Sequence, residues 1–179
     1  MSYAMHVQQL CRLLTAPPQC IAVAGVEVRP FEGSRDISGW IDLMRDAFVA
    51  ADPPMRPWTT ADFEKHFLSH ADRSPDEIFL ACDGEYRLIG SVALRVRSGR
   101  DRKHIPAIHW LAVRPAWRRR GVARLLVAHL ERVCWQRGMR EIHLETHTGW
   151  HEAARFYEAI GYLPTHQVTE RSSMRTAPD

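Results

Sequence analysis

The chain has 179 residues, 45% of them hydrophobic, and its 24 basic and 21 acidic residues give a formal net charge of +3. This length fits one globular domain with its own core, and so small a net charge favours no class of partner by itself. The four cysteines are widely spaced and no apolar run reaches the roughly 18–20 residues of a membrane span, so we expect reduced thiols, no membrane and a place in the cytoplasm.

The first part of the chain is predicted to hold an extension, a strand and two helices. Residues 1–24 are interpreted as an N-terminal extension, without the apolar core of a signal peptide, that contains a short helix at 7–14. Residues 26–31 alternate in polarity like a strand, and residues 36–50 carry apolar side chains at helical spacing. A proline-rich loop then leads to a helix that runs to Leu68, with Thr59 or Thr60 as its expected N-cap.

From residue 78 onward the pattern predicts strands that alternate with helices. A tight turn at Asp83-Gly84 joins the first two strands. The expected elements are, in order, strands at 78–82, 88–96 and 105–113, a helix at 119–137, a strand at 142–146, a helix at 151–160 and two short strands within 162–175. This order predicts an α/β fold in which helices cover a mixed sheet.

The turn between the strand at 105–113 and the next helix has the composition of a phosphate site. Arg118-Arg119-Arg120 precedes Gly121, whose missing side chain lets the backbone approach a ligand, and the free N–H groups of a helix start favour an anion. Residues 100–140 carry eleven basic side chains against two acidic ones, which suits a polyphosphate ligand and would also suit nucleic acid.

Two motifs resemble the signatures of the GNAT superfamily of N-acetyltransferases. Arg118-x-x-Gly121-x-Ala123, which follows Leu111-Ala112-Val113-Arg114-Pro115, is similar to the family's central motif, and the stretch from Ala153 to Tyr162 is similar to its second. The resemblance covers residues 25–179. It implies a mixed, mostly antiparallel sheet of six to seven strands, flanked by about four helices, in which two central parallel strands splay apart and acetyl-CoA enters the gap.

The resemblance also implies which residues bind acetyl-CoA. Backbone groups of Leu111 and Val113 would pair with the pantetheine arm, and the amides of residues 119–124 would hold the pyrophosphate. At position 150 this chain has Trp where many members have an Asn that bonds the pantetheine arm. The expected cofactor-binding residues are Leu111, Ala112, Val113, Arg118, Arg119, Arg120, Gly121, Val122, Ala123, Arg124, Trp150, Ala153 and Tyr157.

Three residues are candidates for the catalytic groups. Tyr157 matches the family tyrosine that donates a proton to the leaving thiolate. Glu145 and His109 match positions of general bases in different members, and the choice between them is open. His143 and His147 fall on the predicted strand while His151 starts the next helix, so their four-residue spacing does not predict a metal site.

The sequence therefore predicts an N-acetyltransferase without a metal that moves an acetyl group from acetyl-CoA, as co-substrate, to an amine on a small molecule or a protein N-terminus. Two alternatives remain. The basic segment 100–140 fits a nucleic-acid-binding module, although the leading expectation involves no nucleic acid, and a CoA-binding regulatory domain without turnover would keep the same motifs. The acceptor amine and the formation of a homodimer are left open.

Overall fold

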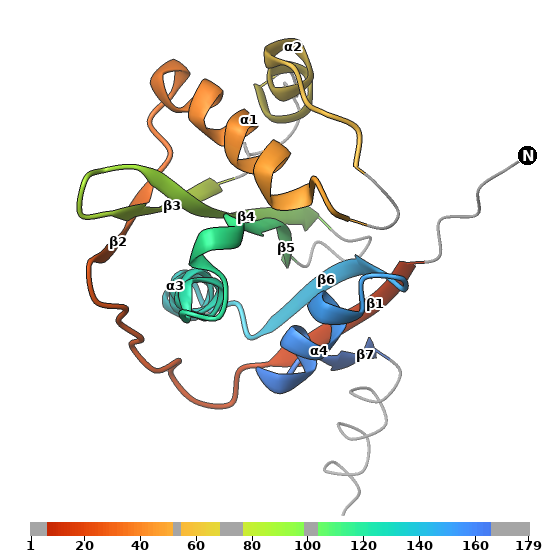
Figure 1. Cartoon of the computed structure of the whole chain (residues 1–179). Helices are drawn as coiled ribbons and strands as arrows, with labels where there is room; N and C mark the ends of the chain where they lie inside the picture. Colours follow the sequence, from red (N-terminus) through yellow and green to blue (C-terminus); the bar gives the residue numbers. More distant parts are fainter. Residues whose placement is uncertain (1–6, 52–54, 69–76, 99–103, 166–179) are drawn as a thin grey trace, which may run out of the picture.

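A computed structural model describes residues 7–51, 55–68, 77–98 and 104–165. It contains a seven-stranded sheet in the order β2-β3-β4-β5-β6-β1-β7 (Figure 1). The strands are β1 (Val7–Leu13), β2 (Val26–Pro30), β3 (Glu77–Asp83), β4 (Leu88–Ser98), β5 (His104–Val113), β6 (Glu141–His147) and β7 (Leu163–Pro164). The α-helices are α1 (Ser34–Phe48), α2 (Thr60–Phe63), α3 (Val122–Gln136) and α4 (His151–Ala159).

One pair of neighbouring strands in this sheet is parallel. β5 pairs with β6 only at Ala107 with His143 and Ile108 with Leu144, although both strands continue beyond these residues. Trp110, two residues after the last pair, has a φ of +53°, and the register between β4 and β5 shifts between Ser91 and Ala93. This bulge turns β5 away from β6, because an extra residue bends the strand that contains it. The mostly antiparallel sheet with two parting parallel strands is confirmed.

The sheet separates two hydrophobic cores. On one face, α1 and α2 cover a core centred on Trp40, which is fully buried and donates from Nε1 to Ser91 Oγ at 3.0 Å. On the other face, α3 packs on β4 so closely that a Cβ at Gly90 would lie 3.0 Å from Leu126 and 3.1 Å from Val122. Figure 1 shows α1 and α2 on the opposite side of the sheet from α3. β5, the strand that leads into the turn with the composition of a phosphate site (residues 114–121, called the phosphate turn below), is thus held between two packed layers.

Most of the predicted elements are present, with shifted ends. Thr59 is the N-cap, and its side chain forms a capping box with Asp62. After α2 the chain continues as a π-helical turn, Glu64–Leu68. α3 begins at Val122, three residues later than predicted, because Arg119 and Gly121 both have positive φ. Of the predicted tail strands, only β7 falls within the described residues, and the rest of 162–175 lies outside them after residue 165.

The predicted helix at 7–14 is wrong. This segment is β1, which pairs along its whole length with β6 and contacts β7 on its other edge. Leu10 and Cys11 are 3% and 1% exposed although they are adjacent, because successive side chains of a strand point to opposite faces and both faces are covered here. The division of the chain into 1–24 and 25–179 stays a prediction.

Within the described residues, no helix has both the length and the apolar character needed to cross a membrane.

Candidate active site

The turn between β5 and α3 presents backbone N–H groups to one side of the sheet. A short 3-10 turn, Pro115–Trp117, follows β5, and Gly121 is then the N-cap of α3 with a φ of +87°. Arg119 also has a left-handed φ, of +61°. Alternating left-handed residues before a helix start form a concave arrangement of N–H groups that binds anions. The local backbone therefore has the form of a phosphate cradle.

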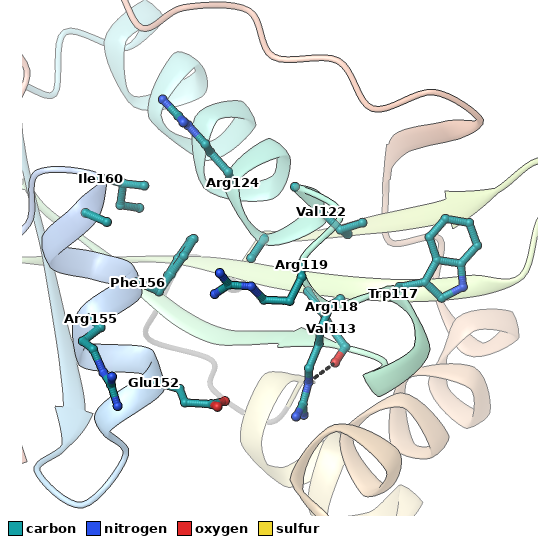
Figure 2. A pocket seen from close by; sticks show the side chains of 13 residues that line it. Val113, Trp117, Arg118, Arg119, Val122, Arg124, Glu152, Arg155, Phe156 and Ile160 are labelled. Atoms are coloured by element: carbon teal, nitrogen blue, oxygen red, sulfur yellow. Dashed lines mark hydrogen bonds between the residues drawn. The ribbon is translucent and has the colours of Figure 1, made fainter.

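A cavity of about 630 Å³ lies between this turn and α4 (Figure 2). Seven of the predicted cofactor-binding residues line it: Val113, Arg118, Arg119, Gly121, Val122, Ala123 and Arg124. The other predicted positions, namely Leu111, Ala112, Arg120, Trp150, Ala153 and Tyr157, are not among its described lining residues. The cavity is large enough for an elongated ligand that passes along the start of α3.

The wall that α4 contributes was not predicted. Glu152, Arg155, Phe156, Ala159 and Ile160 line the cavity from this helix, together with Trp117 from the 3-10 turn. On α4 they recur at spacings of three and four residues, the spacing of one helix face. That periodicity is present in the sequence, but it identifies a ligand-facing surface only once α4 is known to lie opposite the turn.

Among the arginines of the cavity, Arg118 is held by two backbone carbonyls. Arg118 donates from Nε to the Val113 carbonyl at 3.4 Å (Figure 2). It also donates from Nη2 to the Ala47 carbonyl at 2.5 Å, so it ties the turn to the end of α1. Arg119, Arg124 and Arg155 line the cavity around the single acidic lining residue, Glu152. The described lining thus carries a net positive charge where an anion would enter.

Much of the basic segment 100–140 is paired within the protein. Arg114 forms an ion pair with Asp46, and Arg137 forms one with Glu77. Arg120 lies over the Trp117 ring at 5.1 Å, and Arg140 over the Trp135 ring at 3.7 Å. Such contacts fix these cations locally and spread them over several elements, which argues against one continuous surface for a phosphate backbone.

The two candidate bases lie where β5 and β6 part. His109 and Glu145 are each the first residue after the last paired residue of their strands. Ala107 and His143 share a face of the sheet, so His109 and Glu145, two residues further along, lie on that same face. Glu145 is exposed and accepts from Gln9 Nε2 at 3.4 Å, whereas His109 is half-buried. The structure thus brings both groups to the opening between the strands.

Tyr157 lies on the opposite side of the sheet, in the core beneath α3 and α4. It is 7% exposed, and its ring lies 5.3 Å from Phe156 and 5.8 Å from Tyr162. Burial raises the pKa of its phenol well above the ordinary value of about 10, so the hydroxyl stays protonated at neutral pH. A group in this state can donate a proton and cannot serve as a base.

Two indoles, of Trp110 and Trp150, border the opening between β5 and β6. Trp150, the N-cap of α4, contacts Phe48 at the end of α1 with ring centroids 5.4 Å apart. Trp110 packs against Trp58 at 4.7 Å and also against His66, which contacts Arg95 at 2.8 Å. The Nε1 atoms of Trp110 and Trp150 are buried and have no hydrogen-bond partner in the described part of the chain. Both indoles pack against other rings as core residues do, but the Nε1–H group of each donates no hydrogen bond within the described residues.

Comparison with known proteins identifies relatives that are acetyltransferases. The model of the acetyltransferase (GNAT) family matches residues 38–162. An acetyltransferase of Pectobacterium atrosepticum is 30% identical over 116 residues, which cover 64% of this chain and 76% of that protein.

Solved structures share the fold. A GCN5-related N-acetyltransferase from Sphaerobacter thermophilus has a TM-score of 0.64 and 22% identity over 78% of this chain, which spans only 42% of that one. An aminoglycoside acetyltransferase from an uncultured soil metagenomic sample has a TM-score of 0.59 and 20% identity over 75% of this chain and 86% of its own. The family match extends over both the phosphate turn and α4. The chain belongs to the acetyltransferase (GNAT) family, whose members transfer acetyl groups.

Proposed function

We propose that this protein is an N-acetyltransferase that uses acetyl-CoA as the acyl donor and a primary amine as the acceptor. One observation carries the proposal. The opening between β5 and β6 has the phosphate cradle and Tyr157 on one side of the sheet, and His109 and Glu145 on the other. A donor and an acceptor that enter from opposite faces can meet in this opening.

The phosphate cradle fits the donor. Gly121 and Arg119 are left-handed in the turn, and the side chains of Arg119, Arg124 and Arg155 line the adjoining cavity. β5 runs on from Ile108 to Val113 without a β6 partner. Backbone groups of Leu111 and Val113 on that side are therefore suited to an extended amide-bearing arm.

Residues at the opening have defined tasks in the reaction. Acetyl-CoA supplies the acetyl group as a thioester, and the amine nitrogen forms the new C–N bond while the C–S bond breaks. An alkylammonium with a pKa near 10.4 must first lose a proton, which costs about 4.6 kcal/mol at pH 7. Glu145 or His109, directly or through a water molecule, takes that proton, and Tyr157 gives its proton to the departing sulfur.

The decisive experiment is a screen of amines with acetyl-CoA that measures thiol release. Aminoglycosides, polyamines, amino acids, arylalkylamines and peptides with free N-termini cover the acceptor classes that the proposal admits. Acetyl-CoA should raise the melting temperature, and at least one amine should give acetyl-CoA-dependent thiol release. A thermal shift without any turnover would support the regulatory alternative. If neither signal appears, the proposal is wrong.

The pH dependence of kcat in two variants distinguishes which of the two candidates is the base. Glu145→Gln and His109→Gln keep the size of each side chain while removing its ability to accept a proton. We expect the variant that lacks the working base to lose about 10²–10⁴-fold in kcat and to lose the acidic limb of its kcat profile. Gln9→Leu, which removes only the side-chain partner of Glu145, is the matched control. A wild-type profile in both base variants would exclude both residues.

A further inference from the structure

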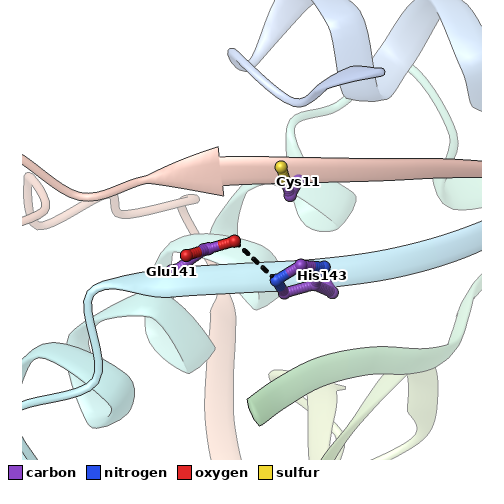
Figure 3. A group of neighbouring side chains, drawn as sticks. All are labelled: Cys11, Glu141 and His143. Atoms are coloured by element: carbon purple, nitrogen blue, oxygen red, sulfur yellow. Dashed lines mark hydrogen bonds and ion pairs between the residues drawn. The ribbon is translucent and has the colours of Figure 1, made fainter. Parts of the chain in front are cut away.

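β1 brings Cys11 to two other ligand-type side chains on β6. Cys11 is directly opposite His143 in the antiparallel pair, and Glu141 is two residues before His143. Residues opposite one another, and residues two apart on one strand, share a face of the sheet. One ligand atom from each of the three residues lies within 4.8 Å of the other two. Figure 3 shows the three neighbouring side chains on β1 and β6.

The three side chains combine the ligand types that zinc prefers. They offer one thiolate sulfur, one imidazole nitrogen and one carboxylate oxygen, and zinc binds each of these three donor types. His143 Nε2 already lies 2.9 Å from Glu141 Oε1. In the part of the chain that the structure describes, this is the one cluster of three His, Cys, Asp or Glu side chains with such spacing.

The cluster needs little movement to reach a tetrahedral arrangement. Zinc bonds of 2.0–2.3 Å place neighbouring ligand atoms about 3.3–3.6 Å apart, so the widest separations must close by roughly 1 Å. Cys11 is buried and held by the sheet. The Glu141 and His143 side chains are 52% and 29% exposed, so they are free to rotate toward the sulfur.

An ordinary ion pair does not account for the third member of the cluster. A surface pair such as Glu141 with His143 contributes about 0–1 kcal/mol to stability, and it requires no thiol. The antiparallel register nevertheless places the Cys11 sulfur beside both groups. A cation bound by all three side chains would use this position of the sulfur, in place of the thiol's present contact with the Thr165 side chain.

We propose that Cys11, Glu141 and His143 bind one zinc ion that links β1 to β6, with water as the fourth ligand. The thiol proton of Cys11 is released to solvent when the Zn–S bond forms. The ion joins two strands that are far apart in the sequence, so its role is to stabilise the sheet. This site is separate from acetyl transfer and does not depend on the proposed function.

Cobalt and zinc titrations of the untagged, metal-free full chain test the site. Co²⁺ should bind at one equivalent and give a thiolate-to-cobalt charge-transfer band in the near ultraviolet, together with visible bands of tetrahedral intensity. Zn²⁺ should displace it. Cys11→Ser should abolish the charge-transfer band, whereas Cys20→Ser, which changes an exposed thiol outside the cluster, should retain it.

Because Cys11 is buried, variants of its exposed neighbours keep the test independent of folding. Glu141→Gln and His143→Gln should each weaken Zn²⁺ binding at least about tenfold. Zn²⁺ should raise the melting temperature of the wild type and leave that of the double variant unchanged. Absence of the charge-transfer band, its survival in Cys11→Ser, or wild-type zinc affinity in both surface variants would overturn the proposal. None of these readouts uses acetyl-CoA, so a failed acetyl-transfer assay leaves the result unaffected.

Discussion

At the scale of single residues, the environment of Tyr157 decides what it can do. Its phenol is enclosed by α3, α4 and two aromatic rings, and burial raises its pKa because the charged form loses its hydration. The neutral form therefore persists to higher pH than in water. The residue is available as an acid across the range in which the amine acceptor becomes deprotonated.

Tyr157→Phe is expected to lower kcat by about 10²–10⁴-fold while changing the KM for acetyl-CoA little. In the wild type, deprotonation of Tyr157 should cause no decrease in kcat as the pH rises to about 10, the ordinary pKa of a phenol. Steady-state kinetics from pH 6 to pH 10 measure both.

Tyr162→Phe is the matched control for that variant. Tyr162 is also buried, but its hydroxyl donates to Glu131 at 2.9 Å, so its loss should affect stability and leave kcat near that of the wild type. Equal kcat in Tyr157→Phe and the wild type would remove Tyr157 from the reaction.

At the scale of elements, two glycines with similar backbone geometry test the phosphate cradle. Gly121 and Gly138 flank α3 with φ of +87° and +76°, so alanine at either position is strained by about 1–2 kcal/mol. Relief of that strain at Gly121 would rotate the amides that we propose hold the pyrophosphate. Gly121→Ala should weaken acetyl-CoA binding about tenfold or more, since each charge-assisted hydrogen bond contributes about 1.5–3 kcal/mol.

Gly138→Ala should lose similar stability and keep the wild-type affinity for acetyl-CoA. Isothermal titration calorimetry, alongside urea unfolding, separates the two effects. If both variants bind acetyl-CoA equally well, the N–H groups at Gly121 do not hold the ligand.

The packing of α3 on β4 depends on a third glycine, Gly90. A Cβ at Gly90 would meet two side chains of α3 and the Ala112 carbonyl at 3.0–3.2 Å. Gly90→Ala should therefore lower the free energy of unfolding by about 1–3 kcal/mol through overpacking. Gly84→Ala, where an added Cβ has nothing within 4 Å, should change it by less than about 0.5 kcal/mol. Urea unfolding that ranks these two variants the other way would contradict this description of the interface.

The same elements show how far the sequence leads. Strand alternation, the helical spacing of residues 36–50 and the Thr59 N-cap are local signals, and the elements they predict are present. Val7, Leu10, Cys11 and Leu14 also follow helical spacing, yet the segment is a strand because β6 and β7 supply partners on both of its edges. That information is not local. For the same reason the sequence predicts the phosphate turn but not the α4 wall or the cluster around Cys11.

At the scale of the whole molecule, β1 is tied to the α3 layer by a buried ion pair. Arg12 Nη1 lies 2.8 Å from Glu131 Oε1, with side chains 33% and 4% exposed, and Tyr162 donates to the same oxygen. Burial raises the pKa of Glu131, while Arg12 and Tyr162 act in the opposite direction. Removal of Arg12 would therefore leave a buried charge, whereas removal of the carboxylate would leave an arginine that reaches water.

Arg12→Met should accordingly destabilise the protein more than Glu131→Gln does. We expect a loss of roughly 2–3 kcal/mol at pH 7, below the 3–5 kcal/mol of fully buried pairs, because Arg12 is one-third exposed. Protonation of Glu131 removes the unpaired charge. The loss of unfolding free energy in Arg12→Met, relative to the wild type, should therefore become smaller as the pH falls below the raised pKa of Glu131. Urea unfolding at pH 7 and pH 4.5 measures this difference. A deficit that grows on acidification would contradict the assignment.

The place of β1 between β6 and β7 also bears on how the chain acquires its fold. During synthesis β1 is made before the other strands of the sheet, but both of its neighbours, β6 and β7, follow Arg140 in the sequence. The sheet from β2 to β5 can assemble while Leu10 and Cys11 still lack partners. Contacts between such distant segments close slowly, and unpaired strands are prone to associate with other chains. A newly made molecule therefore exposes Leu10 and Cys11 until β6 and β7 have been made, and conditions that slow the synthesis of these two strands favour aggregation over folding.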